Sequence, residues 1–406
     1  MTPPFRKRIL EAHGDARSVT SEGSTGAERA APNAARPEPI WVYHYEHPAQ
    51  RWTLAIATHA EPGSQKLSLG GFRIAPRERT DRPDFDPDRE AIELAIGMEE
   101  KVYWSRLLHV GGPLAQRDFG RIVGGKCVLE PTPDARVGCP RDFEMLDFAI
   151  TCLNDCATSA GIHITTGQDL GHGVMSDGHT QSLDYLNRGF PGSVVADTSL
   201  PTAEGNYQVL RGMLRGVEIP IERATIGLIG VGHIGHRVLE NLCHDGARIL
   251  AVEANASRRA DVAARGIRVW SAEGKHEFLR QPMDALTLNA AGGSLDAAAI
   301  DDCVRNERLR VVCGSENLVM PDPRGADVLQ RGHKVYCPTE LGGMMGYLTA
   351  VEEYLAHVEA QAFDIETLFA AARRLELVGY EGTKLVRERS FELSFEDAVR
   401  EIFAGR

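Results

Sequence analysis

Three glycines that follow an apolar run have a spacing typical of a turn that binds phosphate groups. The run Thr225–Ile229 leads into Gly230, Gly232 and Gly235, which are spaced G-x-G-x-x-G. In this pattern the first glycine makes a turn and the second lets the backbone approach a pyrophosphate. The third lets a helix pack closely on the strand. The spacing predicts a dinucleotide-binding turn between a strand and a helix.

The residues after the glycines complete this unit. His233 and Ile234 would open the helix, whose unpaired N–H groups attract an anionic pyrophosphate. A second apolar run, Ile249–Val252, leads to Glu253, about 20 residues beyond Gly230, where a carboxylate accepts hydrogen bonds from a ribose diol. Strand, helix and acid in this order predict a βαβ unit that binds a nicotinamide dinucleotide.

The charges near Glu253 bear on which dinucleotide binds. Glu253 favours NAD, because its carboxylate would repel the 2′-phosphate of NADP. Arg258 and Arg259 follow closely. They either lie on the solvated face of the next helix or offset that repulsion, so NADP stays open. Asn289, at the end of the apolar run 284–289, is a further predicted cofactor-binding residue.

The composition excludes several classes of partner. The chain has 406 residues, with 45 Lys and Arg against 57 Asp and Glu, which gives a formal charge of −12. This charge argues against nucleic acid or a membrane surface as partner. No apolar run reaches the roughly 20 residues of a membrane span. Eight scattered cysteines without C-x-x-C pairs predict free thiols, no metal site and a cytoplasmic location.

Residues 1–38 differ from the rest of the chain, because they are rich in Ala, Pro, Arg, Ser and Glu. A disordered or loosely packed tail is predicted there, with a transit peptide as the alternative.

Two adjacent strands are predicted next, joined by a hairpin or a short loop. They are Trp52–His59 and the stretch LSLGGFRI, residues 67–74.

A helix is predicted to start at Asp86-Pro87, and Lys101 falls on its apolar face with Leu94 and Met98. A lysine on such a face either pairs with an anion or extends toward solvent, and the spacing does not decide between these.

Farther on, a helix over 141–158 and a strand over 162–165 are predicted. They place Asp169 in a loop at a strand end, where function is common.

From Gly205 onward apolar strands alternate with helices, which is typical of a doubly wound parallel sheet. The last residues look helical, with one glycine-containing break around 379–383. The predicted strands are 225–229, 247–252, 267–270, 284–289, 309–313 and 334–337.

The whole pattern predicts an α/β protein of two domains. Residues 39–204 would form an α/β substrate, catalytic and oligomerisation domain, and residues 205–346 a Rossmann domain. Residues 347–406 would form helices that pack back on the cleft between the domains.

Several stretches, in the correct order, resemble the glutamate/leucine/phenylalanine/valine dehydrogenase family, and most of all its shorter leucine and phenylalanine members. The resemblance covers roughly residues 41–355, and VGGKCVLEPTP is its sharpest motif. The other stretches are GGFRI, GMEEK, ITTGQDLG, SLPTAEGNY, GVGHIG and GSENLVM. The resemblance implies a homo-oligomeric amino-acid dehydrogenase that converts an L-amino acid reversibly to a 2-oxo acid and ammonia.

The resemblance also implies roles for single residues. Lys126 would be the catalytic lysine, Asp169 the acid that shuttles protons, and Lys101 the cation that holds the substrate carboxylate. A desolvated lysine with a lowered pKa suits a base that must act on an amine, and a permanently charged one suits a carboxylate. Without the family context, Lys126 would be interpreted as a surface residue and Asp169 as a turn cap.

Three more residues receive roles only through the resemblance. Gly70 and Gly71 would approach the substrate with their backbone, and Thr202 would lie near the nicotinamide. Gly167 replaces a family alanine, which would widen the side-chain pocket. His172 and His179 either join proton transfer or are solvent-exposed loop residues, and exposure is the preferred interpretation.

Two further departures from the family pattern concern the substrate. The stretch GGPLAQRDFGRI, residues 111–122, is inserted between Lys101 and Lys126, and it either reshapes the pocket or covers it as a lid. The family Asn that helps to position substrate and nicotinamide is missing near residues 339–341. These departures predict an enzyme for a non-standard amino acid.

Two other functions stay open from the sequence. One is a reductase that acts on another imine or carbonyl substrate, and the other is a regulatory homologue that binds nucleotide without turnover. The presence of Lys101, Lys126 and Asp169 argues against the second, because a buried charged cluster is costly to keep for stability alone.

Overall fold

The computed structural model of the chain describes residues 5–13 and 39–404, which form two compact units. The first unit comprises Met1–Val102, Asp118–Ala196 and Glu353–Val358. The second comprises Tyr103–Arg117, Asp197–Glu352 and Glu359–Arg406. Within the described ranges, no helix combines the length and apolar character needed to cross a bilayer.

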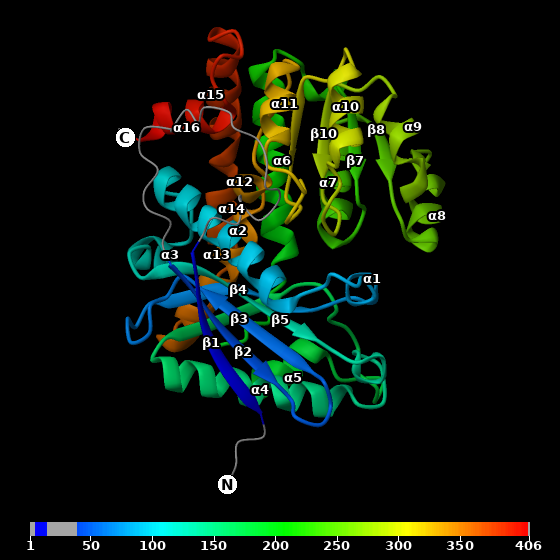
Figure 1. Cartoon of the computed structure of the whole chain (residues 1–406). Helices are drawn as coiled ribbons and strands as arrows, with labels where there is room; N and C mark the ends of the chain where they lie inside the picture. The colour runs from blue at the N-terminus through cyan, green and yellow to red at the C-terminus, as the bar shows by residue number, and fades with distance from the viewer. Residues whose placement is uncertain (1–4, 14–38, 405–406) are drawn as a thin grey trace, which may run out of the picture. The chain divides into compact units, whose positions relative to one another are not determined.

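The first unit is built on a six-stranded mixed sheet (Figure 1). Its order is β1-β2-β3-β5-β4-β6. The strands from β1 to β5 along this order pair antiparallel, whereas β4 runs parallel to both β5 and β6. The bounds are β1 (Arg6–His13), β2 (Pro39–Glu46), β3 (Thr53–Thr58), β4 (Leu67–Ile74), β5 (Ile122–Glu130) and β6 (His163–Gln168).

Strands β3 and β4 are not neighbours, so the prediction of two adjacent strands is wrong. β5 lies between them and pairs with both, with Ala57 of β3 opposite Lys126. β4 approaches β5 closely because of its glycines, since a Cβ added to Gly70 would lie 1.8 Å from the carbonyl oxygen of Gly125. Residues 59–66 connect β3 to β4 across the intervening β5. Local sequence does not reveal this pairing, because β5 lies far along the chain.

Strand β1 is a correction to the tail predicted over residues 1–38. The amine of Lys7 lies 2.6 Å from Asp155 Oδ2, and the Tyr45 hydroxyl donates to the same oxygen at 2.8 Å. The ring of Phe5 meets Tyr45 edge-on, with centroids 5.0 Å apart. These contacts attach β1 to β2 and α4. Residues 14–38 lie outside the described part of the chain.

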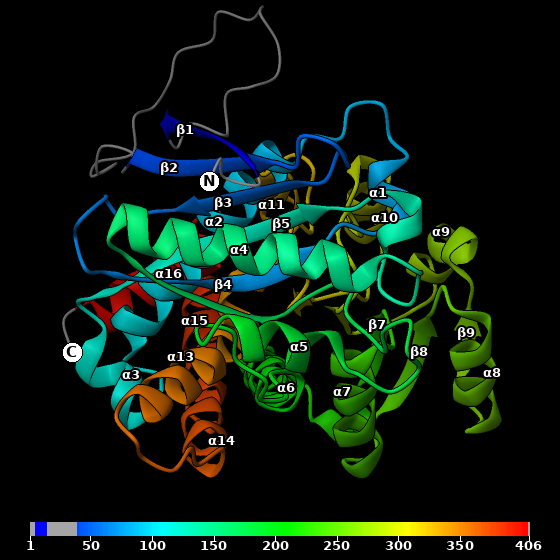
Figure 2. The same cartoon turned by 90° about the horizontal axis from the view of Figure 1, so that it is seen from below.

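Two long helices lie on opposite faces of this sheet (Figures 1 and 2). Helix α4 shares a hydrophobic core with Phe72, Cys127 and Ile164 of three strands. Helix α2 approaches the other face, where a Cβ on Gly124 would lie 2.3 Å from the amide nitrogen of Glu99. The helices are α1 (Arg77–Thr80), α2 (Pro87–Leu108), η1 (Pro133–Ala135), α4 (Asp142–Ala160) and α5 (Ser182–Gly189).

The second unit confirms the predicted doubly wound sheet. Its six strands are all parallel, in the order β12-β11-β10-β7-β8-β9. The strand bounds are β7 (Thr225–Ile229), β8 (Arg248–Val252), β9 (Arg268–Trp270), β10 (Ala285–Leu288), β11 (Val311–Gly314) and β12 (Val335–Tyr336).

Helices surround this parallel sheet, and two of them extend from one unit into the other along the chain. These two are α2, already given, and α13. The remaining helices are α3 (Pro113–Asp118), α6 (Ser199–Gly216), η2 (Ile221–Arg223), α7 (His233–His244), α8 (Ala256–Ala264), η3 (Ala272–Gly274), α9 (Lys275–Leu279), α10 (Ala297–Arg305), α11 (Gly325–Arg331), α12 (Thr339–Gly342), α13 (Met344–Val358), α14 (Glu366–Arg373), α15 (Leu375–Glu388) and α16 (Phe395–Phe403).

The glycine-containing break predicted around 379–383 is wrong, because helix α15 runs through it without interruption. Gly379 and Gly382 instead serve packing. A Cβ on Gly379 would lie 2.4 Å from the carbonyl oxygen of Val209 on α6, and one on Gly382 would lie 2.8 Å from the ring of Phe395. Small residues let two helices approach closely, and the gain in packing outweighs the poor helix propensity of glycine.

We therefore expect Gly379→Ala to destabilise the second unit. The new methyl group would meet backbone rather than a flexible side chain, so α15 must move away from α6. Overpacking of this kind costs about 1–3 kcal/mol. Gly120→Ala is the matched control, because nothing lies within 4 Å of its Cβ position. Denaturant midpoints of the two variants and the parent check this, and equal midpoints would contradict it.

Candidate active site

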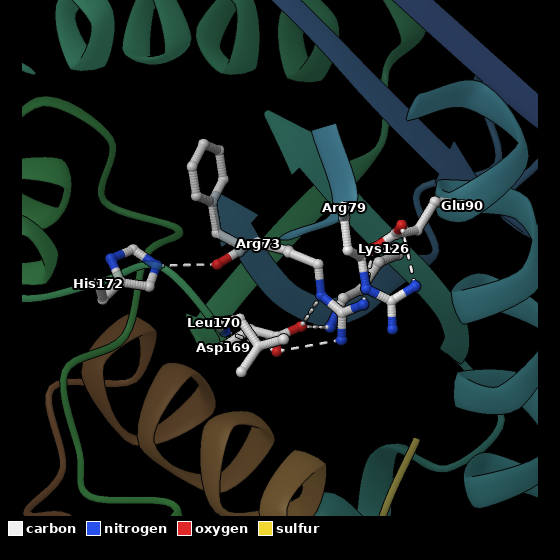
Figure 3. A network of polar contacts seen from close by, with 8 residues as sticks. Arg73, Arg79, Glu90, Lys126, Asp169, Leu170 and His172 are labelled. Atoms are coloured by element: carbon white, nitrogen blue, oxygen red, sulfur yellow. Dashed lines mark hydrogen bonds and ion pairs between the residues drawn. The ribbon is translucent and has the colours of Figure 1, made fainter. Parts of the chain in front are cut away.

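Lys126 and Asp169 form an ion pair on the face of the first sheet that is turned away from α4 (Figure 3). Lys126 lies on β5 and is 4% exposed, and Asp169 follows directly after β6. Gly71 of β4 lies beside both. A Cβ there would be 2.8 Å from the Lys126 amine and 3.1 Å from Asp169 Cβ. The pair therefore fits only because position 71 has no side chain.

Arg73 is the third member of this cluster, and the sequence analysis did not identify it. Its Nε and Nη2 lie 3.2 and 3.3 Å from the two carboxylate oxygens of Asp169. Its Nη1 donates to Glu90 Oε1 on α2 at 2.7 Å, and Arg79 reaches the other Glu90 oxygen at 3.3 Å. Arg73 is 2% exposed. It stands two residues after Gly71 in GGFRI, so alternation along β4 could have placed it beside the lysine.

The surroundings shift the pKa values of Lys126 and Asp169 in the same direction. Burial lowers the pKa of Lys126, the charge of Asp169 opposes this, and Arg73 lowers it further. Burial tends to raise the pKa of Asp169, but the charges of Arg73 and Lys126 outweigh it and hold that pKa far below its usual range. Asp169 is thus held as a carboxylate beside a lysine that loses its proton readily. Such a pair can take up and pass on protons.

The loop that carries Asp169 is fixed by His172, which corrects the preferred interpretation of this histidine as solvent-exposed. His172 is partly buried, and its Nε2 donates to the carbonyl oxygen of Phe72 at 2.8 Å. That bond leaves Nδ1 to accept from the Ser182 hydroxyl at 2.9 Å, so the ring is neutral. His179 is exposed, as predicted.

Two more predicted residues lie in the first unit. Gly70 sits next to Gly71 on β4, packed on the carbonyl of Gly125. Lys101 lies on α2 and is 6% exposed, so it is a buried lysine rather than one that extends into solvent. These positions are compatible with the substrate-binding roles that the sequence analysis assigned to them, which remain predictions.

In the second unit the glycine motif forms a close-packed turn. Gly230 has a φ of 85°, which favours glycine, and a Cβ on Gly235 would lie 1.9 Å from its carbonyl oxygen. Gly232 precedes α7, whose first residues are His233 and Ile234, and the start of α7 has no side-chain cap. Apart from its two neighbours along the chain, the only described heavy atom within 4 Å of a Cβ on Gly232 is Arg258 Nη1, at 3.5 Å.

Glu253 follows β8, as predicted, but the residue is only 5% exposed and its carboxylate is already bonded. Its two oxygens accept the amides of Val231 and Asn255, each at 2.7 Å. Arg259 donates to the carbonyl oxygens of Glu253 and Ala254, at 2.8 and 2.9 Å. Glu253 thus holds the glycine turn and the start of α8 together, which is a structural role that the sequence did not reveal.

Asn289 is positioned by a side chain that the sequence analysis missed. Asn206 on α6 donates to Asn289 Oδ1 at 2.6 Å, and Ser315 donates to the same oxygen at 2.7 Å. Asn206 stands within SLPTAEGNY, so the motif contained it without indicating its partner. Thr202, one turn earlier on α6, is 4% exposed and donates to the carbonyl of Thr198 at 2.6 Å.

Comparisons with known proteins agree with this arrangement, although no family model matches the chain. Valine dehydrogenase from Streptomyces coelicolor is 25% identical over 314 residues, which is 76% of each chain. Phenylalanine dehydrogenase from Lysinibacillus sphaericus is 23% identical over 299 residues, covering 70% of this chain and 69% of the other. These similarities support the chain as a divergent member of the amino-acid dehydrogenase family.

Solved structures show the same fold. The L-tryptophan dehydrogenase of Nostoc punctiforme superposes with a TM-score of 0.57 at 16% identity, covering 87% of this chain and 92% of the other. The hetero-hexameric glutamate dehydrogenase of Thermus thermophilus gives 0.61 at 14% identity, covering 97% and 86%. The two-domain dehydrogenase fold is thus shared.

The stretch 111–122, predicted from the sequence to be an insertion, contains helix α3, most of which belongs to the second unit. Glu352, 3% exposed, accepts the amides of Leu114 and Ala115 at 3.0 and 2.9 Å. A Cβ on Gly112 would lie 2.3 Å from the Glu352 carboxyl carbon, so glycine is needed for this approach. A carboxylate at the first turn of a helix satisfies N–H groups that lack partners. The start of the insertion is therefore anchored by a buried acid.

The segment where the sequence lacks the family Asn is also held by close contacts. Thr339, 1% exposed, opens the short helix α12. A Cβ on Gly342 would lie 2.1 Å from the carbonyl oxygen of Gly314 at the end of β11. The backbone is thus packed closely against the sheet, with Thr339, Glu340 and Leu341 in the stretch where the Asn was expected.

The neutral state of His172 predicts a loss of stability at acidic pH. Burial lowers its pKa below the ordinary 6.5 in the folded protein, although the bond to Phe72 opposes this. As the pH falls below about 6.5, the unfolded chain takes up the proton first, so the free energy of unfolding decreases. His172→Gln, which keeps a donor for Phe72, should weaken this dependence. Denaturant midpoints between pH 7.5 and 5.5 check it, and parallel profiles for both proteins would contradict it.

Proposed function

We propose that this chain is an NAD-dependent dehydrogenase that converts an L-amino acid reversibly to a 2-oxo acid and ammonia. The carrying observation is the buried cluster of Lys126, Asp169 and Arg73. It supplies a lysine with a lowered pKa, a carboxylate held in its charged form, and a guanidinium that fixes this carboxylate.

In this proposal Lys126 and Asp169 are the catalytic residues. Neutral Lys126 accepts a proton at Nζ from the water that adds to the oxidised carbon, and its N–H then donates to the developing carbonyl oxygen while the amine leaves as ammonia. Asp169, in contact with Nζ, passes protons between the lysine, the amine and water. Arg73 positions Asp169 and favours its carboxylate form, so that a proton accepted by Asp169 is passed on rather than kept.

Substrate binding is proposed for four residues. Lys101 supplies a fixed charge for the substrate carboxylate, and Gly70 and Gly71 let the substrate approach the backbone of β4. Thr202 is proposed beside the nicotinamide. Gly167, the insertion and the missing Asn support a non-standard amino acid as substrate. Robust turnover of leucine, valine, phenylalanine or glutamate at ordinary concentrations would refute that point.

The cofactor is proposed to be NAD, which supplies the hydride acceptor. The residues present fit it, because the uncapped start of α7 and the open space over Gly232 can receive a pyrophosphate. The holding residues are proposed to be Gly230, Gly232, His233, Ile234, Gly235, Glu253 and Asn289. Arg258, close to Gly232, keeps NADP as the alternative. A cytoplasmic homo-oligomer is proposed by analogy with the relatives.

The decisive assay is oxidation of NADH at 340 nm with a panel of 2-oxo acids and excess ammonium, repeated with NADPH. We expect ammonium-dependent oxidation, which Lys126→Ala should reduce by about 10²–10⁴-fold, the usual worth of a general acid–base group. Lys384→Ala is the control, since the Lys384 side chain is 46% exposed. Oxidation that needs no ammonium would instead favour a reductase, and NADH binding without turnover would favour a regulatory homologue.

The proposed role of Lys101 predicts a different kinetic effect. Lys101→Ala should raise the KM for the 2-oxo acid about 10–100-fold, because a charge-assisted hydrogen bond to the carboxylate is lost. Cofactor affinity should stay unchanged. Steady-state kinetics and NADH fluorescence titration measure the two quantities. An unchanged KM would remove Lys101 from the substrate site and leave the role of Lys126 intact.

A further inference from the structure

Three hydroxyl groups on and beside β6 are buried without a hydrogen-bond partner in the described chain. They belong to Thr165, Thr166 and Ser193, which are 1%, 0% and 0% exposed. A buried hydroxyl without a partner is costly, because it has lost water and gained nothing. Such a group in a folded protein therefore calls for an explanation.

The two threonines point to opposite faces of the sheet, because side chains alternate along a strand. Ile164 belongs to the core that the strands share with α4, so Thr166 is on that face and Thr165 on the other. Lys126 is on the same face as Thr165, since its neighbour Cys127 belongs to the α4 core. The unpaired Thr165 hydroxyl and the catalytic cluster thus share one face.

The register of the strands places Thr165 one step from this cluster. Gly71 is opposite Gly167 and adjoins the Lys126 amine, and Leu69 is opposite Thr165. Thr165 is therefore two residues from Gly167 along β6, about 7 Å away. On the other side of Gly71 along β4 stands Arg73, where the space is filled by its ion pair with Asp169.

A substrate side chain that runs along the strands from Lys126 would follow one of two directions over this face. Toward Arg73 its side chain would meet paired charges, and toward Leu69 it would meet an apolar side chain and the Thr165 hydroxyl. Leu69 and Thr165 are both 1% exposed and uncharged. A charged substrate group would be buried there without a counter-charge, which is strongly unfavourable.

We infer that Thr165 is a specificity-determining residue whose hydroxyl bonds to an uncharged polar group, a hydroxyl or a carboxamide, on the substrate side chain. This inference rests on the proposed function. Substrate binding would then give the buried hydroxyl its missing partner. A site built to hydrogen-bond a substrate group also discriminates against analogues that lack it.

The test compares near-isosteric amino acids that differ in such a group. The pairs are threonine against valine, asparagine against leucine, and tyrosine against phenylalanine, each assayed for oxidative deamination. We expect kcat/KM to favour the polar member of at least one pair. Thr165→Val should reduce that preference about tenfold, the worth of roughly one neutral hydrogen bond.

Thr166→Val is the matched control, because Thr166 is the next residue on β6, equally buried and equally unpaired, but faces α4. Both substitutions remove an unpaired hydroxyl, so both should raise the melting temperature, which shows that the variants fold. Only Thr165→Val should change the substrate preference.

Two results would overturn the inference while the proposed function stands. One is turnover that favours the apolar member of every pair, and the other is an equal change of preference in both variants. Absence of turnover with all amino acids and with the panel of 2-oxo acids would refute the proposed function, and the inference with it.

Discussion

The cluster of buried ionisable groups around Asp169 is the constraint on which the first unit depends. Lys126 and Arg73 both face Asp169, and all three are almost withdrawn from water. Removing one partner from such a group leaves an uncompensated buried charge, which typically costs about 3–5 kcal/mol. Three features hold these groups together. Gly71 leaves space for the Lys126 amine, and the pairing of β4 with β5 and β6 sets the strands side by side. Glu90 on α2 binds Arg73.

One helix of the second unit, α7, differs from several of its neighbours in lacking a side-chain cap at its start. Helices α8, α10 and α16 begin with side-chain caps from Asn255, Asp296 and Ser394. Helix α7 begins at Gly232, which has no side chain to offer. Its first N–H groups have no side-chain cap, and Glu253 fixes the preceding turn by accepting the amide of Val231. An anion that binds there meets donors that need no rearrangement.

The sequence predicted what depends on local pattern. All six strands of the second sheet and the glycine turn were found, because apolar alternation and G-x-G-x-x-G spacing are local signals. Lys126 and Asp169 were found through the family resemblance, and the structure brings them into contact. Arg73, Asn206 and the His172 bonds were missed because each depends on a partner far along the chain. β1 was missed for the same reason, since Lys7 becomes structural only beside Asp155.

The division of the chain into units has a consequence for its synthesis. Glu353, in the segment that returns to the first unit, accepts the amides of Val195 and Ala196 at 3.2 and 2.9 Å. The first unit is therefore incomplete until residue 358 has left the ribosome, by which time most of the second unit has also emerged. Domains usually fold one after another during translation. In this chain the amino-terminal unit gains its last helical segment only after most of the carboxyl-terminal unit has been made, so the completion of one depends on the synthesis of the other.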